Sequence, residues 1–99
     1  MSENQVTVIA LIEAKPGCDS DVRNGLLKLA GPTRKEPGCI NYDIHLSKDH
    51  SGLFMIHENW KSRQELDRHL EMPYLKGFLE ETANKLAKPV EVTTWGLIG

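Results

Sequence analysis

The sequence predicts an α+β fold of the ferredoxin-like type, in which helices cover one face of a four-stranded antiparallel sheet. Segments with the two-residue period of strands alternate with segments of helical period in the order β-α-β-β-α-β, with the second helix divided in two. The first three strand segments carry apolar residues on both faces. Because monomers rarely expose such a surface, we expect a homodimer whose two sheets pack face to face.

The first strand and the first helix are predicted from their apolar periods. Residues Gln5–Ala14 place apolar side chains on both sides of an extended chain, which is typical of a covered strand. A helix follows from Asp19 to about Lys35, and Asp19 or Ser20 is expected to cap its start. We expect Pro32 to kink this helix or to break its last turn, because proline removes one helical hydrogen bond. Its buried stripe is predicted to hold Val22, Leu26, Leu29, Ala30 and Thr33.

Two further strands form a predicted hairpin over Cys39–Ser47 and Leu53–Trp60, separated by the turn-forming residues 48–52. In the first of these strands, four apolar side chains are expected on one face: Ile40, Tyr42, Ile44 and Leu46.

The last third of the chain predicts a split helix and a final strand. Ser62 and Glu65 have the spacing of a capping box, so a short helix is expected to start there. Pro73 suits the first turn of the next helix, which we expect to continue until Pro89 ends it. Residues Val90–Leu97 form the predicted last strand. The stripe of the second helix is predicted to hold Leu75, Phe78, Leu79, Thr82 and Leu86.

Length and charge limit the classes of function. With 99 residues, we expect a single domain over positions 1–99 with one modest core. The chain has 12 Lys and Arg against 14 Asp and Glu, a net charge of −2, so we expect neither a nucleic-acid partner nor an anionic membrane. The longest apolar run, Val8–Ile12, is too short to span a bilayer. The first residues lack the pattern of a secretory signal, so we expect a cytoplasmic protein.

The cysteines and the short motifs predict no disulfide and no cofactor. Cys18 and Cys39 flank the first predicted helix, which separates its ends by roughly 20 Å, too far for a disulfide. The sequence has no C-x-x-C or H-E-x-x-H spacing and no glycine-rich phosphate loop. We therefore expect two free thiols and no metal, flavin or haem in the isolated protein.

Several short stretches of the sequence match a known pattern. They are Thr7-Val8-Ile9-Ala10, Pro16-Gly17, the run 33–39 with Tyr42, and Glu58-x-Trp60-x-Ser62 followed by Leu66, His69, Leu70, Pro73 and Phe78. These stretches resemble the antibiotic-biosynthesis-monooxygenase-like family, and the resemblance covers roughly residues 6–97.

The resemblance implies a dimeric α+β barrel. Members of the family include cofactor-free oxygenases that act on anthrones and quinols, haem-degrading enzymes, an isomerase and proteins of unknown role. The haem-degrading branch uses an asparagine on the first strand, which residues 5–14 lack, and this argues against haem.

His69 is the first candidate for a catalytic residue, because an imidazole titrates near neutral pH and suits a general base. A core histidine bonded to a carbonyl is the alternative, and the family motif favours the base. Glu58 and Trp60 share a strand face. We expect Glu58 to orient His69 or to form a structural hydrogen bond or ion pair, and Trp60 to form a cavity wall or an oxyanion donor.

Tyr74 departs from the family, many of whose members have a second histidine at this position. A phenol is a poor base at pH 7 but donates hydrogen bonds, so Tyr74 is expected to stabilise an oxyanion. The predicted pocket lies between the sheet and the two C-terminal helices. Its expected walls are Trp60, Glu58, Tyr74, Phe78 and Tyr42.

The leading functional hypothesis is a cofactor-independent monooxygenase. A base would deprotonate a small aromatic substrate, quinol-like or anthrone-like, and the resulting anion would react directly with O2. Two alternatives remain open at this point. One is an isomerase that uses the same base without O2, and the other is a dimeric small-molecule-binding or stress protein without enzymatic activity.

Overall fold

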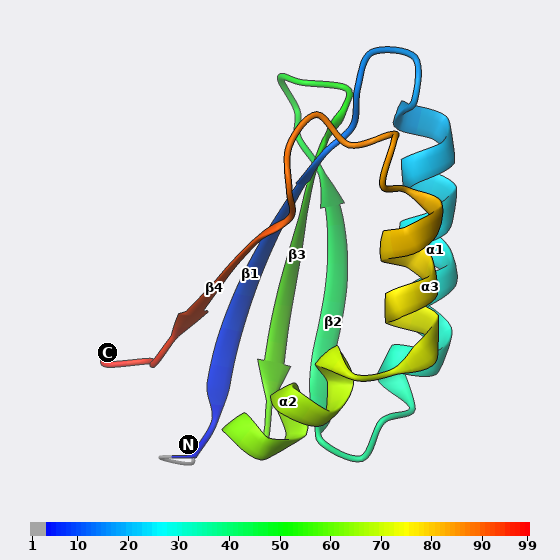
Figure 1. The fold of residues 1–99 in the computed structure, drawn as a ribbon. Helices are drawn as coiled ribbons and strands as arrows, with labels where there is room; N and C mark the ends of the chain where they lie inside the picture. The colour runs from blue at the N-terminus through cyan, green and yellow to red at the C-terminus, as the bar shows by residue number, and fades with distance from the viewer. Residues whose placement is uncertain (1–3) are drawn as a thin grey trace.

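The strands and helices follow the predicted order along the chain in the computed structural model, which describes residues 4–99 (Figure 1). Within these residues, a four-stranded antiparallel sheet has the strand order β2-β3-β1-β4. The ferredoxin-like α+β fold is therefore confirmed, including the divided second helix. The elements are β1 (Val6–Glu13), α1 (Asp19–Arg34), β2 (Cys39–Leu46), β3 (Leu53–Trp60), α2 (Arg63–Leu70), α3 (Pro73–Glu81) and β4 (Glu91–Trp95).

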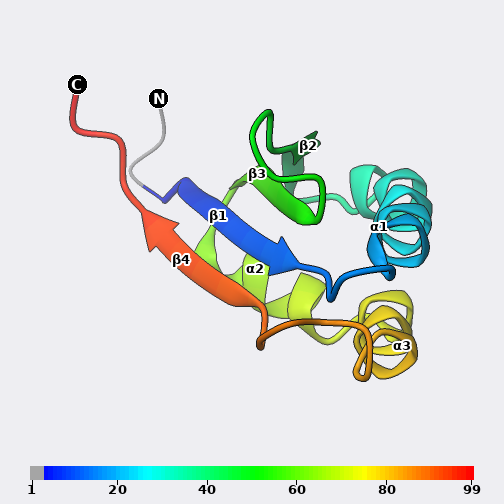
Figure 2. The same ribbon diagram turned by 90° about the horizontal axis from the view of Figure 1, so that it is seen from above.

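The hydrophobic core lies between the sheet and the helices. Figure 2 shows α1 and α3 on the same side of the sheet, with β4 at its far edge. Alternate residues of β1 point toward the helices and are buried: Val8, Ala10 and Ile12. They meet the apolar stripe of α1, whose buried members Val22, Leu26, Leu29, Ala30 and Thr33 are those predicted.

The opposite face of the sheet has apolar residues toward one end, where Glu13, Glu91 and His45 border them, and polar residues at the other. Leu11 and Met55 pair across β1 and β3 at the apolar end. At the polar end, a row of hydrogen-bonded side chains, here called the polar ladder, crosses three strands. Thr7 Oγ1 donates to Asn59 Oδ1 (2.5 Å), and Asn59 Nδ2 donates to Asn41 Oδ1 (2.8 Å). Asn41 Nδ2 in turn donates to an Asp43 carboxylate oxygen (3.0 Å).

β2 corrects one expectation about strand faces. Tyr42 and Ile44 pair with residues of β3 on the helix side, but the register shifts between Cys39 and Asn41. This irregularity takes Ile40 out of the predicted apolar row, and Ile40 is 49% exposed. The other face of β2 holds Asn41, Asp43 and His45, so β2 is apolar on one face and not on two.

The helix starts and ends differ from the predictions at several points. The residue at the start of α1 is Cys18, which caps it with its backbone carbonyl rather than with a side chain. α1 continues through Pro32 to Arg34, so its last turn is not broken there. The capping box is confirmed in its main contact, because the Ser62 hydroxyl accepts the Glu65 backbone N–H (3.3 Å).

α3 ends at Glu81, eight residues before the predicted stop at Pro89. The residues after it leave the helix because their backbone groups pair with the end of β1. Ala87 N donates to Glu13 O, and Lys15 N donates to Lys85 O, both at 2.8 Å. β4 is consequently shorter than predicted and spans Glu91–Trp95.

Cys18 and Cys39 are both free thiols, as predicted. None of the helices in residues 4–99 has the length and apolar character needed to cross a bilayer.

Candidate active site

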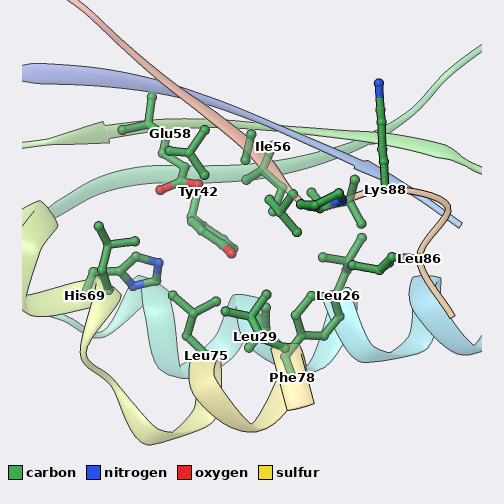
Figure 3. A pocket seen from close by; sticks show the side chains of 18 of the residues that line it. Leu26, Leu29, Tyr42, Ile56, Glu58, His69, Leu75, Phe78, Leu86 and Lys88 are labelled. Carbon is green, nitrogen blue, oxygen red and sulfur yellow. The ribbon is translucent and has the colours of Figure 1, made fainter. Parts of the chain in front are cut away.

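A cavity of about 740 Å³ lies between the sheet and the helices, in the predicted place (Figure 3). Glu58, Tyr42 and Phe78 line it as expected, together with His69. Trp60 and Tyr74 do not line it, which corrects the prediction for these two side chains. Trp60 is fully buried behind His69, and the hydroxyl of Tyr74 is directed to a carboxylate outside the cavity lining.

His69 lies in the last turn of α2 and is 2% exposed. Its Nδ1 is 2.8 Å from Glu36 Oε2. The ring stacks on Trp60 with 4.6 Å between the ring centroids, and its other neighbour is the edge of Tyr42 at 5.8 Å. Figure 3 shows the imidazole at one end of the cavity, beside Tyr42. Because Nδ1 is bonded to Glu36, Nε2 is the nitrogen left for a bound molecule.

Glu36 is a candidate site residue that sequence reasoning missed. It lies between α1 and β2 and is buried, although a charged loop residue is usually exposed. One oxygen, Oε2, meets both His69 Nδ1 and the Tyr74 hydroxyl, which donates a short hydrogen bond to it. The only sequence signal was its place inside the family-like run 33–39, before Pro37-Gly38.

Gly38 explains how the loop that carries Glu36 approaches α2. A Cβ at this position would lie 2.2 Å from the Cβ of Glu65, closer than two carbon atoms can pack. Ser62 caps the same helix, and Gly38 O accepts the Lys61 backbone N–H (2.9 Å). These contacts hold the start of α2 against the Glu36 loop, and His69 follows on the same helix.

Glu58 does not orient His69, contrary to the expected contact. Its Oε1 accepts the indole N–H of Trp60 (2.9 Å), the structural bond that was the alternative. Glu58 is 4% exposed in an apolar wall. Burial raises the pKa of Glu58 to about 7, partly opposed by the Trp60 hydrogen bond and reinforced by the charge of Glu36. Near pH 7 about half of the Glu58 carboxyl is therefore protonated and neutral, and this fraction rises as the pH falls.

Both tyrosines of the site remain protonated. Burial, followed by the charge of Glu58, raises the pKa of Tyr42 well above its usual range. Burial and the hydrogen bond to Glu36 do the same for the pKa of Tyr74. Tyr42 is thus a neutral donor in the cavity wall, and Tyr74 holds Glu36 from the start of α3.

Across positions 4–99, no group of three or more His, Cys, Asp and Glu side chains is placed to hold a metal ion.

Comparisons with known proteins agree on one family. Residues 5–81 match the family named antibiotic biosynthesis monooxygenase. A Mycobacterium tuberculosis protein with the provisional name of monooxygenase is 35% identical over 88 residues, which are 89% of this chain and 86% of the relative. An uncharacterized protein of Synechocystis is 31% identical over 91 residues, 92% of this chain, and the match spans only 62% of that relative's length.

Solved structures show the same fold. The structure of the Mycobacterium tuberculosis protein superposes with a TM-score of 0.89 at 33% identity, covering 96% of each chain. A Pseudomonas aeruginosa protein superposes with a TM-score of 0.91 at 29% identity, covering 97% of this chain and 96% of the other.

Proposed function

Because the chain belongs to the antibiotic biosynthesis monooxygenase family, we propose that it is a cofactor-independent monooxygenase in which His69 deprotonates a small aromatic substrate. The observation that carries the proposal is a buried imidazole at the end of an apolar cavity, held through Nδ1 by Glu36. Such a pair leaves Nε2 as the base and stabilises the imidazolium that forms. Here Glu36, and not Glu58, is the positioning residue.

The proposed reaction oxidises an acidic CH₂ group of an anthrone-like substrate. His69 Nε2 takes one proton, and the carbanion gives one electron to O2. The substrate radical and superoxide combine to form a C–O bond. The resulting peroxide anion takes the proton back from the His69 imidazolium and then loses water together with the second hydrogen of the CH₂ group, so that one oxygen atom remains as a carbonyl and the other leaves in H2O. The two C–H bonds supply the electrons, and neither a flavin nor a metal enters the balance.

The other polar groups of the cavity suit the charge that develops on the substrate. Deprotonation next to a ring carbonyl places negative charge on its oxygen. Tyr42 and protonated Glu58 are neutral donors in the same wall, and burial strengthens their hydrogen bonds to an oxyanion. We assign them to this role in place of Trp60 and Tyr74, which hold Glu58 and Glu36 respectively.

Oxygen uptake tests the proposal. The protein would be mixed with a panel of anthrones and quinols, with and without added metal or flavin. We expect oxygen consumption that needs neither additive and that is lost in His69→Ala. An absorption spectrum with a stoichiometric flavin or Soret band, or activity that depends on added metal, would contradict the proposal.

We also propose that two copies pair through the open face of the sheet, as is typical of this family. The support is the apolar end of that face, which includes Ile9, Leu11, Leu53 and Met55. A sheet-to-sheet interface should bury more than about 1,200 Å² in total. Sedimentation equilibrium should give a dimer at micromolar concentration, and a stable monomer would contradict this.

An isomerase is the second candidate, and the protonated Glu58 favours it. A base and a neutral acid at one end of a cavity suffice to move a proton between two atoms of a substrate. Under argon, His69-dependent exchange of substrate hydrogen with D2O, without oxygen-dependent turnover in air, would favour the isomerase. Binding without exchange or oxygen uptake would favour a protein that only binds its ligand.

A further inference from the structure

The cavity has two chemically different ends. Figure 3 shows Glu58, Tyr42 and His69 together at one end, while Leu86 lies at the opposite end. The strand register explains this grouping, because Val8 pairs with Glu58 on one neighbour and Glu58 pairs with Tyr42 on the other. We call these three side chains the polar end.

Apart from Lys15 and Lys88, apolar side chains line the remainder of the cavity. From Val8 through Ala10 to Ile12, β1 follows the cavity floor for about 13 Å, at about 3.3 Å per residue. Phe78 supplies an aromatic ring on the opposite wall. The other side chains of this part, here called the aliphatic channel, include Leu26, Leu29, Leu75, Leu79, Leu86 and Val90.

The aliphatic channel opens to solvent along the segment 83–92. Val92 lines the cavity and is nevertheless 48% exposed, and Ala83 is exposed as well. Lys88 stands at this rim, but Figure 3 shows its side chain directed away from the cavity, and its Nζ pairs with Glu91 (3.0 Å). The opening therefore admits an apolar group without presenting the Lys88 amine to it.

We propose that the ligand is an amphiphile, with an oxygen-bearing ring at the polar end and an alkyl or prenyl chain in the aliphatic channel. A ring without a substituent, anthrone-like or quinol-like, would leave much of the aliphatic channel without contacts, whereas an alkyl or prenyl chain attached to the ring fills it. The chemistry at the ring rests on the proposed function, but the binding of the chain does not.

Binding of alkylated hydroquinones tests this inference. Dissociation constants of the intact protein would be measured under argon for methyl-, butyl- and octylhydroquinone. Burial of each methylene should tighten binding by about three- to fourfold until the channel is full. The same dissociation constant for all three ligands would overturn the inference.

A matched pair of variants tests where the alkyl chain of the ligand lies. Ala83→Leu fills part of the channel, and Asn84→Leu introduces the same side chain at the neighbouring exposed position, which does not line the cavity. We expect Ala83→Leu to weaken octylhydroquinone binding roughly tenfold and to leave methylhydroquinone unchanged. Asn84→Leu should alter neither. Equal effects of both variants would contradict the assigned channel.

Oxygen uptake by the same ligands separates the two proposals. Chain-length-dependent binding without oxygen uptake, with these hydroquinones and with the anthrones of the activity panel, would support the amphiphile and overturn the monooxygenase. His69-dependent turnover at the same KM for all three chain lengths would support the monooxygenase and overturn the amphiphile.

Discussion

Two buried carboxylates lie close to the same histidine and have different surroundings. Glu36 receives hydrogen bonds from His69 and Tyr74, in a corner formed by the α1–β2 loop, α2 and α3. Glu58 lies in the apolar wall of β3 with the Trp60 indole as its donor, and its pKa is raised to about 7. Glu36 thus has two side-chain donors and Glu58 has one in a more apolar setting, and this difference supports the proposed roles of Glu36 as the partner of the base and of Glu58 as an acid.

Removing the base should have the largest effect. We expect His69→Ala to lower kcat/KM by roughly 10²–10⁴, the usual contribution of a positioned general base. The fold should persist, because water can enter from the cavity and bond to Glu36. His50→Ala, in the exposed turn before β3, is the control and should retain full activity. A melted His69→Ala protein whose folded fraction keeps its specific activity would make His69 a core residue.

Glu36→Gln should have the second largest effect on activity. The amide keeps the shape of the carboxylate but cannot stabilise an imidazolium, so kcat should fall by about 10² to 10³ with little change in KM. The pH profile of kcat should also change, because the imidazole loses its negative partner. An unchanged pH profile would show that Glu36 serves structure alone. Glu36→Asp is the conservative variant and should recover part of the activity.

Glu58→Gln should change the dependence of stability on pH. The raised pKa of about 7 means that the native state holds a proton which the unfolded state releases near pH 4.5. The stabilisation from this neutral form is complete below pH 4.5 and is lost as the pH rises through 7, by up to roughly 3 kcal/mol. Urea titrations between pH 4.5 and 7.5 should show this decline in the wild type and not in Glu58→Gln. If the free energy of unfolding changes with pH in the same way in both proteins, a group other than Glu58 is responsible for the change.

Gly38→Ala tests the corner that holds Glu36, and it should have the smallest effect of these four substitutions. The added methyl group would collide with Glu65, and the loop should move from α2 at a cost of about 1–3 kcal/mol in the free energy of unfolding. Gly31→Ala, in α1 with open space around it, is the matched control and should not destabilise the protein. Equal stability of the two variants, measured by thermal unfolding, would contradict the tight contact.

The same contrast shows what the sequence could and could not predict. The element order, the α1 stripe and the places of His69 and Glu58 follow from local periods, because buried positions repeat along a strand or helix. The Glu36–His69 contact joins residues 33 positions apart, across a loop that has no period. The end of α3 depended on backbone pairing of residues 85–87 with β1, which a helical pattern does not reveal.

The polar ladder has a consequence for how a second copy can sit on the open face. Asn59 bonds to Thr7 and to Asn41, so these side chains satisfy one another within their own sheet. Covering them requires few new hydrogen bonds from the partner, and the desolvation penalty is correspondingly small. Asp43 at the edge of the ladder is the exception, because covering a charge costs far more than covering an amide that already has a partner. A second sheet that slides across this face would therefore be opposed at Asp43 rather than along the whole ladder.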